Sequence, residues 1–199
     1  MMTIEVFTSD TDLSEERGRE LARRLRDCLT TGHSAPASVV ARAQELTHVT
    51  VHRPLAWATG GPDPERVPRY LLRVTVPGTW IGNEFGEHAI PALTSAVGEF
   101  DGDPQRLHHH PHCVVQVIGL REGTFGTRGV VTSSSDVTRM MTEDYRESAD
   151  LAGGTVDPVC GMTVDPATAR HTLTVDGIEY AFCASVCRKV FAEDHGIAV

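Results

Sequence analysis

The sequence predicts an α+β protein: a duplicated β-α-β domain with a four-stranded sheet and two helices on one face, followed by a small β-hairpin/helix module. Two observations predict this architecture. The order strand, helix, strand occurs twice at a spacing of about 65 to 70 residues, which is the signature of an internal repeat. Three of the five cysteines fall in about the last forty residues, where a hairpin pattern leads into a short helix.

The first repeat begins with alternating apolar residues at 3–7, which predict a strand. Asp12 and Glu15 fit a capping box, and the helix that follows carries one apolar stripe at helical spacing, namely Leu21, Leu25, Cys28 and Leu29. On this stripe Cys28 is best explained as a small core residue. A short helix at 37–46 and a strand at 48–52 complete the repeat.

The second repeat has strands at 70–76 and 114–118 around a helix at about 83–97, and a glycine-rich segment follows at 119–129. Strands that run parallel within each repeat need a crossover, and the helix supplies it. We place the first domain at residues 1–147, with repeats at about 1–60 and 68–130 and a C-terminal extension. Residues 148–154 are small and polar and read as a linker, and the last domain covers 155–199.

Composition excludes two classes of partner. The formal net charge of −9, with no compensating basic cluster, argues against nucleic acid, because binding phosphates needs a basic surface. No run approaches the roughly 18 apolar residues that would span a bilayer, so we expect no membrane segment. The N-terminal residues lack the features of a secretory signal, so we expect a cytoplasmic protein. In that compartment, five cysteines indicate metal or catalytic sites before disulfides.

The duplicated domain resembles the tautomerase superfamily in its fused form, over roughly residues 2–145. The resemblance rests on the opening at 3–29, on the strand 69–77 with its helix, on the strand 114–117 and on the loop 122–129. It implies a homotrimer with active sites near subunit boundaries. It also implies catalysis by an amino-terminal proline, whose secondary amine serves as base or nucleophile.

That proline is absent from this sequence. Met2 stands at the start of the first strand, and Pro68 is internal, so its nitrogen is an amide. The domain is therefore either a trimerising or ligand-binding scaffold, or an enzyme that works without the proline. In the second case Arg73 or Arg128, or a histidine in the pocket, would act, and an arginine would bind a substrate carboxylate by its bidentate fork.

A histidine-rich turn precedes the last strand of the domain. Its metal-ligand types are His108, His110, His112 and Cys113, with His109 between them. In an extended segment His108 and His110 project to one side, and Pro111 interrupts the spacing. The alternative is a solvated connection in which Cys113 begins the core.

The C-terminal module carries the strongest pattern. Strands at 171–175 and 178–182 flank Asp176-Gly177, a strong two-residue hairpin signal. The hairpin delivers Cys183 to the start of a helix at about 184–192, on which Cys187 lies one turn further along. The amide donors at the helix start favour a thiolate there. Cys160 would approach from the turn at 158–161.

This segment is similar over its whole length to the YHS family of metal-binding modules, which are related to TRASH domains. The residues that carry the similarity are Asp157, Pro158, Cys160, Gly161, Met162, Tyr180, Phe182, Cys183, Cys187 and Phe191. The family implies binding of copper, zinc or mercury in metal transport, sensing or resistance. Three thiolates suit Cu(I) or Hg(II), whereas tetrahedral Zn(II) needs a further donor from Met162, His171 or His195.

Two other roles for the three cysteines stay open: packing of a small core without metal, and redox chemistry of Cys183 and Cys187. A unit of about forty residues rarely holds together on apolar burial alone, which favours a metal clip.

The first hypothesis is thus a cytosolic protein in which a tautomerase-like trimer displays metal-binding modules based on Cys160, Cys183 and Cys187, with a metal-handling protein as partner. The alternative is a keto–enol tautomerase or related enzyme acting on a small carboxylate. A third possibility places a catalytic metal near the histidine run.

Overall fold

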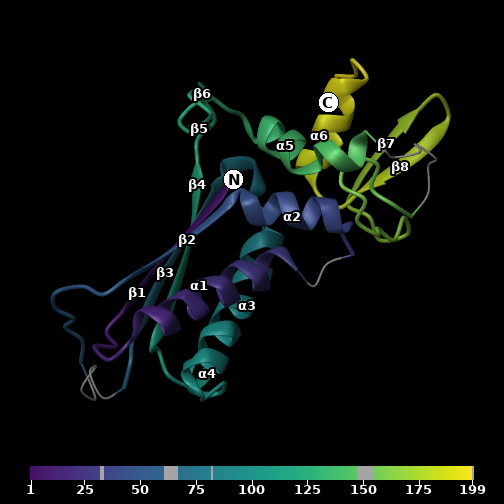
Figure 1. Cartoon of the computed structure of the whole chain (residues 1–199). Helices are drawn as coiled ribbons and strands as arrows, with labels where there is room; N and C mark the ends of the chain where they lie inside the picture. The colour runs from purple at the N-terminus through teal and green to yellow at the C-terminus, as the bar shows by residue number, and fades with distance from the viewer. Residues whose placement is uncertain (32–33, 61–66, 82, 148–154, 199) are drawn as a thin grey trace. The chain divides into compact units, whose positions relative to one another are not determined.

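A computed structural model describes residues 1–31, 34–60, 67–81, 83–147 and 155–198 (Figure 1). Contacts divide the chain into two compact units. We call residues 1–31, 47–76 and 81–120 the sheet unit, and residues 32–46, 77–80 and 121–199 the cysteine unit. The expected linker 148–154 lies outside the described residues.

The sheet unit is built on four strands in the order β2-β1-β3-β4. The strands are β1 (Met2–Thr8), β2 (Thr47–His52), β3 (Tyr70–Pro77) and β4 (Cys113–Leu120). β1 pairs in parallel with β2, from Met2–Thr47 to Phe7–His52, and antiparallel with β3. The amide of Tyr70 donates to the carbonyl of His112, so β3 and β4 start at the same end of the sheet. The expected four-stranded sheet is confirmed, and the two strands of the first repeat run parallel as predicted.

Two long helices cover one face of this sheet, α1 (Glu15–Thr30) and α3 (Asn83–Asp101), and they pack against each other (Figure 1). Alternate residues of β1 and β3 face them and are buried, whereas their neighbours on the other face are half-buried. Leu21 and Leu25 of α1 are fully buried, as the apolar stripe predicts.

The capping residue of α1 differs from the predicted capping box. Ser14, not Asp12, is the N-cap of α1, and its side chain accepts a hydrogen bond from the amide of Arg17. Asp12 lies two residues earlier, in a turn where its amide donates to Asp10. A cap must directly precede the first helical residue, and only Ser14 does so.

The cysteine unit gathers segments that are distant in sequence. It contains α2 (Ala37–Glu45), a 3-10 turn η1 (Gly78–Trp80), a short hairpin of β5 (Gly126–Thr127) and β6 (Val130–Val131), and α5 (Ser134–Arg146). The C-terminal hairpin of β7 (His171–Val175) and β8 (Ile178–Phe182) and the helix α6 (Ser185–Asp194) follow. α5 packs against both α2 and α6. The guanidinium of Arg139 on α5 pairs with Glu193 at 2.7 Å and Asp194 at 3.0 Å on α6.

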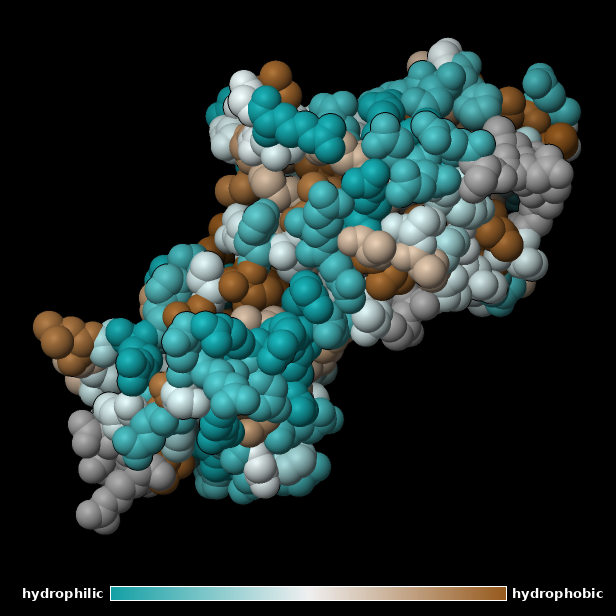
Figure 2. Space-filling view, in the orientation of Figure 1, coloured by the Kyte–Doolittle hydropathy of each residue, from teal (hydrophilic) through white to brown (hydrophobic). Residues whose placement is uncertain are grey.

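Exposed apolar side chains are scattered rather than gathered on the face that Figure 2 shows, where brown residues lie among teal and white ones. The exposed large apolar residues are Leu55, Ile81, Ile90, Val114, Ile118, Val130, Val131, Val156 and Ile178. No helix in the described parts of the chain combines the length and the apolar character that crossing a membrane requires.

Candidate metal centre

The hairpin and helix of the C-terminal module place two cysteines one helical turn apart. Asp176 and Gly177 both have positive φ, at 51° and 79°, as a type I′ turn requires, and they join β7 to β8 in the predicted register. β8 ends at Phe182, so that Cys183 leaves the hairpin directly before α6 begins. Cys187 then lies in the first turn of α6.

The third cysteine comes from a closed turn. The amide of Asp157 donates to the carbonyl of Met162 at 2.9 Å, and the amide of Gly161 donates back to the carbonyl of Asp157 at 2.8 Å. Gly161 adopts a φ of 72°, which glycine accepts without strain. Between these bonds the turn directs Cys160 toward α6.

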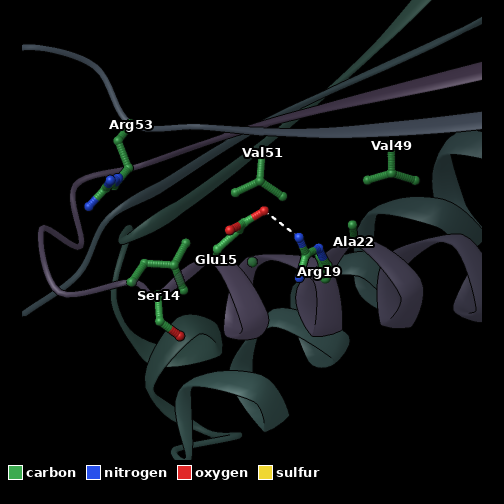
Figure 3. A pocket seen from close by; sticks show the side chains of 9 residues that line it. Ser14, Glu15, Arg19, Ala22, Val49, Val51 and Arg53 are labelled. Carbon is green, nitrogen blue, oxygen red and sulfur yellow. Dashed lines mark hydrogen bonds and ion pairs between the residues drawn. The ribbon is translucent and has the colours of Figure 1, made fainter.

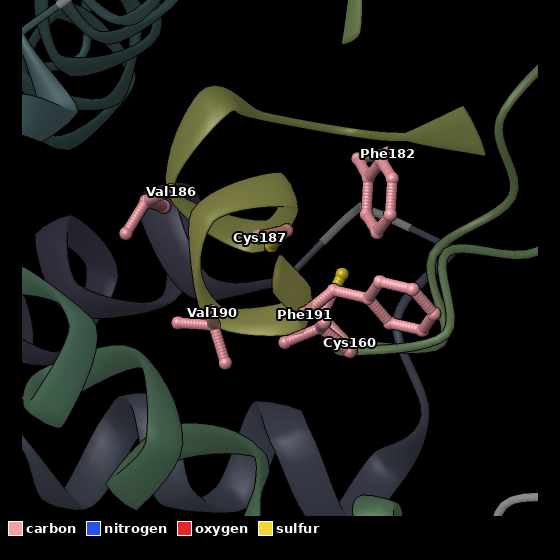
Figure 4. Close-up of a cluster of buried hydrophobic side chains, with 7 residues drawn as sticks. Cys160, Phe182, Val186, Cys187, Val190 and Phe191 are labelled. Atoms are coloured by element: carbon pink, nitrogen blue, oxygen red, sulfur yellow. The ribbon is translucent and has the colours of Figure 1, made fainter. Parts of the chain in front are cut away.

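The three thiols meet in the core of the cysteine unit. The sulfur of Cys183 lies 3.4 Å from that of Cys160 and 3.7 Å from that of Cys187. Cys160 and Cys187 are buried, whereas Cys183 is partly exposed. Figure 4 shows Cys160 and Cys187 in one cluster with Phe182 and Phe191. One edge of the site is therefore open to solvent and the remainder is enclosed by aromatic and aliphatic side chains.

A buried carboxylate joins the three thiols. The ligand atoms of Asp157, Cys160, Cys183 and Cys187 all lie within 4.8 Å of one another. Within the described residues this is the one group of three or more Cys, His, Asp or Glu side chains that could surround a single ion. Sequence reasoning gave Asp157 no role at the site. The sequence feature that could have indicated a role for Asp157 is the pair Asp-Pro. Such a pair starts turns in which the Asp side chain accepts a hydrogen bond from the backbone two residues further on.

The pKa values of the three thiols shift in different directions. Hydrogen bonds with Cys183 and Cys187 lower the pKa of Cys160, and the bonds with Cys160 raise the pKa values of the other two thiols. Burial raises the pKa of Asp157 to about 6, with a further contribution from the charge of Cys160, although the amides of Cys183 and Val159 oppose the rise. Because thiolates are the form that binds metal, an ion that enters this site displaces thiol protons.

The donor set fits a thiophilic ion. Thiolates that bind one zinc at about 2.3 Å lie roughly 3.8 Å apart, which is close to the two sulfur separations found here. Three sulfurs in an apolar pocket are soft ligands that suit Cu(I), Zn(II) or Hg(II) rather than Mg(II) or Ca(II).

Of the other predicted donors of the module, His171 and His195 do not join this group. Met162 is half-buried against the cluster and its backbone amide bonds the sulfur of Cys160. His171 is the first residue of β7 and pairs with Phe182. The ring of His195 stacks on Phe191 at 4.0 Å, and its Nδ1 donates to the Phe191 carbonyl at 2.7 Å.

The histidine run is helical at His108 and His109 and extended from His110, so the fully extended geometry considered for it does not apply. Residues Arg106–His109 form α4, because the backbone turns back at Asp103, whose side chain accepts from the amide of Arg106. His108 Nε2 contacts the hydroxyl of Ser95 at 3.2 Å. His112 Nδ1 accepts from Arg106 at 3.0 Å, and its ring stacks on His110. Cys113 begins β4, and burial raises its pKa to about 11. Among the described residues this run forms no group of three metal-ligand side chains.

The catalytic candidates lie in different units. Arg73 of β3 lies over the ring of Phe7 at 5.3 Å on the half-buried sheet face. Arg128 adopts a φ of 55° in the turn between β5 and β6. Met2, which stands where the family's proline is expected, is buried and pairs with Thr47 in β1.

The sheet unit also has a groove of about 360 Å³ between the start of α1 and the edge strand β2 (Figure 3). Its polar side chains bond each other or the backbone: Glu15 pairs with Arg19, and Arg53 donates to the carbonyl of Thr11 at 2.9 Å. Val49 and Val51 form its apolar wall. None of the predicted site residues lines this groove.

No protein-family model matches the chain, and no curated protein matches its sequence. Solved structures do resemble it. Macrophage migration inhibitory factor of Toxoplasma gondii has 11% identity and a TM-score of 0.48, covering 65% of this chain and 99% of that one. The structure titled "Pt0534 inactivated by 2-oxo-3-pentynoate" has 19% identity and a TM-score of 0.49, covering 68% of this chain and 96% of that one. The structure titled "R7 fused 4-OT wild type asymmetric trimer" has 18% identity and a TM-score of 0.48, covering 65% of this chain and 94% of that one. These neighbours have tautomerase-superfamily folds.

Proposed function

We propose that this chain is a metal-binding protein whose C-terminal module takes one thiophilic ion, Cu(I) or Zn(II), or the mercury ion as a toxic mimic, through Cys160, Cys183 and Cys187. The observation that carries the proposal is the convergence of three thiols from a turn and a helix start, with sulfur separations of 3.4 and 3.7 Å. The similarity of residues 155–199 to YHS modules supports the same function and suggests metal handling in the cytoplasm with a partner protein that delivers or accepts the ion.

The test is the metal content of protein purified without a histidine tag. We expect about one equivalent of Cu(I) or Zn(II) bound per wild-type chain, and loss of that equivalent in Cys183→Ser. The chain supplies matched controls in Cys28→Ser and Cys113→Ser, because these thiols lie in the sheet unit. Wild-type protein that binds no ion, or Cys183→Ser protein that binds as tightly as wild type, contradicts the proposal.

A homotrimer is the assembly that we propose for the sheet unit. The sheet face away from α1 and α3 carries half-buried or exposed residues along all strands, and on β4 it includes the exposed Val114 and Ile118. Burying apolar side chains of this kind stabilises oligomers. Sedimentation equilibrium of the wild type and of Val114→Glu tests it, since a monomeric wild type excludes the trimer.

Catalysis by the sheet unit on a small carboxylate is the second function that we propose to test. Arg73 favours it, because a half-buried guanidinium beside an aromatic ring suits a planar carboxylate. Ketonisation of phenylenolpyruvate by wild type, abolished in Arg73→Ala and retained in Cys183→Ser, would establish an activity independent of the metal centre.

A further inference from the structure

Asp157 is a fully buried carboxylate whose oxygens bond the backbone of the metal centre. It is 0% exposed. Its Oδ1 accepts from the amides of Val159 at 2.8 Å and Cys160 at 3.3 Å, and its Oδ2 accepts from the amide of Cys183 at 2.8 Å. A buried carboxylate without such partners would cost several kcal/mol, so these three amides account for its presence in an apolar core.

These bonds join two ligand-bearing segments. Cys160 comes from the turn that closes at Met162, and Cys183 comes from the end of β8. Both backbones are tied to one side chain, so their sulfur atoms are brought to 3.4 Å before any ion arrives. A site that is held in place in this way loses less conformational entropy when it binds.

The same bonds occupy the carboxylate, one oxygen of which lies within 4.8 Å of the three sulfurs. Oδ1 accepts two amides, which uses both of its lone pairs, and Oδ2 already accepts one. Turning either oxygen onto an ion would break a buried amide hydrogen bond. Leaving a buried donor unpaired costs about 1 to 3 kcal/mol.

We propose that Asp157 is a positioning residue that fixes Cys160 and Cys183 through their backbone amides and leaves the donor set of the site to sulfur. This inference rests on the proposed function and names a residue on which affinity depends without contact to the ion. Outer partners of metal ligands of this kind change affinity by about 10- to 100-fold when they are removed.

The variant Asp157→Asn tests the proposal selectively. Its amide oxygen can still accept from Val159 and Cys160, whereas its amide nitrogen faces the Cys183 amide, donor against donor. Asp165→Asn is the matched control, because Asp165 makes the same kind of bond to the amide of Ala167 at 3.0 Å in an exposed turn of the module.

The probe is Co(II), with Zn(II) in competition. We expect Asp157→Asn to bind Co(II) about 10- to 100-fold more weakly than wild type, with unchanged positions of the sulfur-to-Co(II) and d–d absorption bands at saturation. Asp165→Asn should match wild type in Co(II) affinity and in the positions of the absorption bands. Equal affinity of Asp157→Asn and wild type overturns the positioning role, and shifted bands show that the carboxylate is a ligand.

A measurement on wild type alone covers the case in which Asp157→Asn does not fold. In Zn(II)-loaded wild type, the amide protons of Val159, Cys160 and Cys183 should be at least as protected from exchange as they are in chelator-treated wild type. Loss of protection at Cys183 on loading overturns the proposal, because it means that the carboxylate has moved to the ion. Wild type that binds neither Zn(II) nor Co(II) refutes the proposed function itself, whereas wild type that binds while Asp157→Asn binds equally refutes only this inference.

Discussion

The sheet unit and the cysteine unit have cores of different composition. The core of the sheet unit is aliphatic where it is deepest, with Ile4, Val6, Leu21, Leu25, Leu72, Val74, Val76, Leu93 and Val97 all fully buried. The core cluster of the C-terminal module consists of Val159, Cys160, Phe182, Val186, Cys187, Val190 and Phe191. Two of its seven members are thiols, and the carboxylate of Asp157 is buried beside them.

Because of this difference, we expect the stability of the sheet unit to be independent of metal binding and the stability of the C-terminal module to depend on it. Aliphatic burial stabilises the sheet unit without any ligand. In the module the buried groups are also the proposed ligands, so an ion adds directly to the stability of the folded state. Four predictions sharpen this comparison.

Metal removal should act on the cysteine unit and spare the sheet unit. At a free ion concentration of 1,000 times the Kd, binding stabilises the folded module by about 4 kcal/mol. We expect chelation to accelerate amide hydrogen exchange in β7, β8 and α6, and to leave β1 and β3 unchanged. Uniform acceleration across both units would break the comparison.

Leu21→Ala should destabilise the sheet unit and leave metal binding by the cysteine unit unchanged. Leu21 is fully buried in the sheet unit, so the truncation should lower the free energy of unfolding by about 2 to 5 kcal/mol in urea titrations. The ion equivalents bound by the folded protein should not change. Leu55→Ala is the control, because Leu55 is fully exposed and should shift stability by less than about 0.5 kcal/mol. A loss of bound metal in folded Leu21→Ala would contradict the independence of the two cores.

Gly161→Ala should be more damaging than Gly177→Ala, although both glycines have positive φ, at 72° and 79°. A Cβ at Gly161 would lie 2.5 Å from Pro36 Cγ and 2.8 Å from Tyr145 Cε2, whereas at Gly177 it would meet nothing within 4 Å. Both variants carry backbone strain of about 1 to 2 kcal/mol, and only Gly161→Ala adds overpacking of about 1 to 3 kcal/mol. Thermal unfolding and Zn(II) affinity measure the difference, and equal losses would show that the packing around Gly161 yields freely.

Thiol reactivity should show the smallest effect. Burial is the first cause that raises the pKa of Cys28 to about 11, aided by Asp27 and Glu99, and burial does the same for Cys113. Both are then protonated at pH 8, with a thiolate fraction on the order of 0.1%. Alkylation by iodoacetamide, followed by mass spectrometry, should be slow at pH 8 and rise about tenfold per pH unit toward pH 11. Fast modification at pH 8 would show that burial does not raise the pKa values of these two thiols.

Local signals predicted the elements of both units well. Alternation identified β1 and β3, whose buried faces repeat every second residue. The pair Asp176-Gly177 set the hairpin register, since few residues other than glycine, asparagine and aspartate accept positive φ at both turn positions. The cap of α1 was misplaced by two residues because Asp12 and Ser14 are both good caps, and only the backbone path decides between them.

The sequence by itself determined which residue types meet at the C-terminal site, because the hairpin and the i, i+4 spacing that bring Cys183 and Cys187 together are local geometry. Tertiary structure decided what surrounds them. The helical turn of the histidine run depends on Asp103 and Arg106, and the gathering of α2 with α5 depends on packing between segments about a hundred residues apart. The place of Asp157 between Cys160 and Cys183 depends on a turn meeting the end of a strand, and no periodicity records such a meeting.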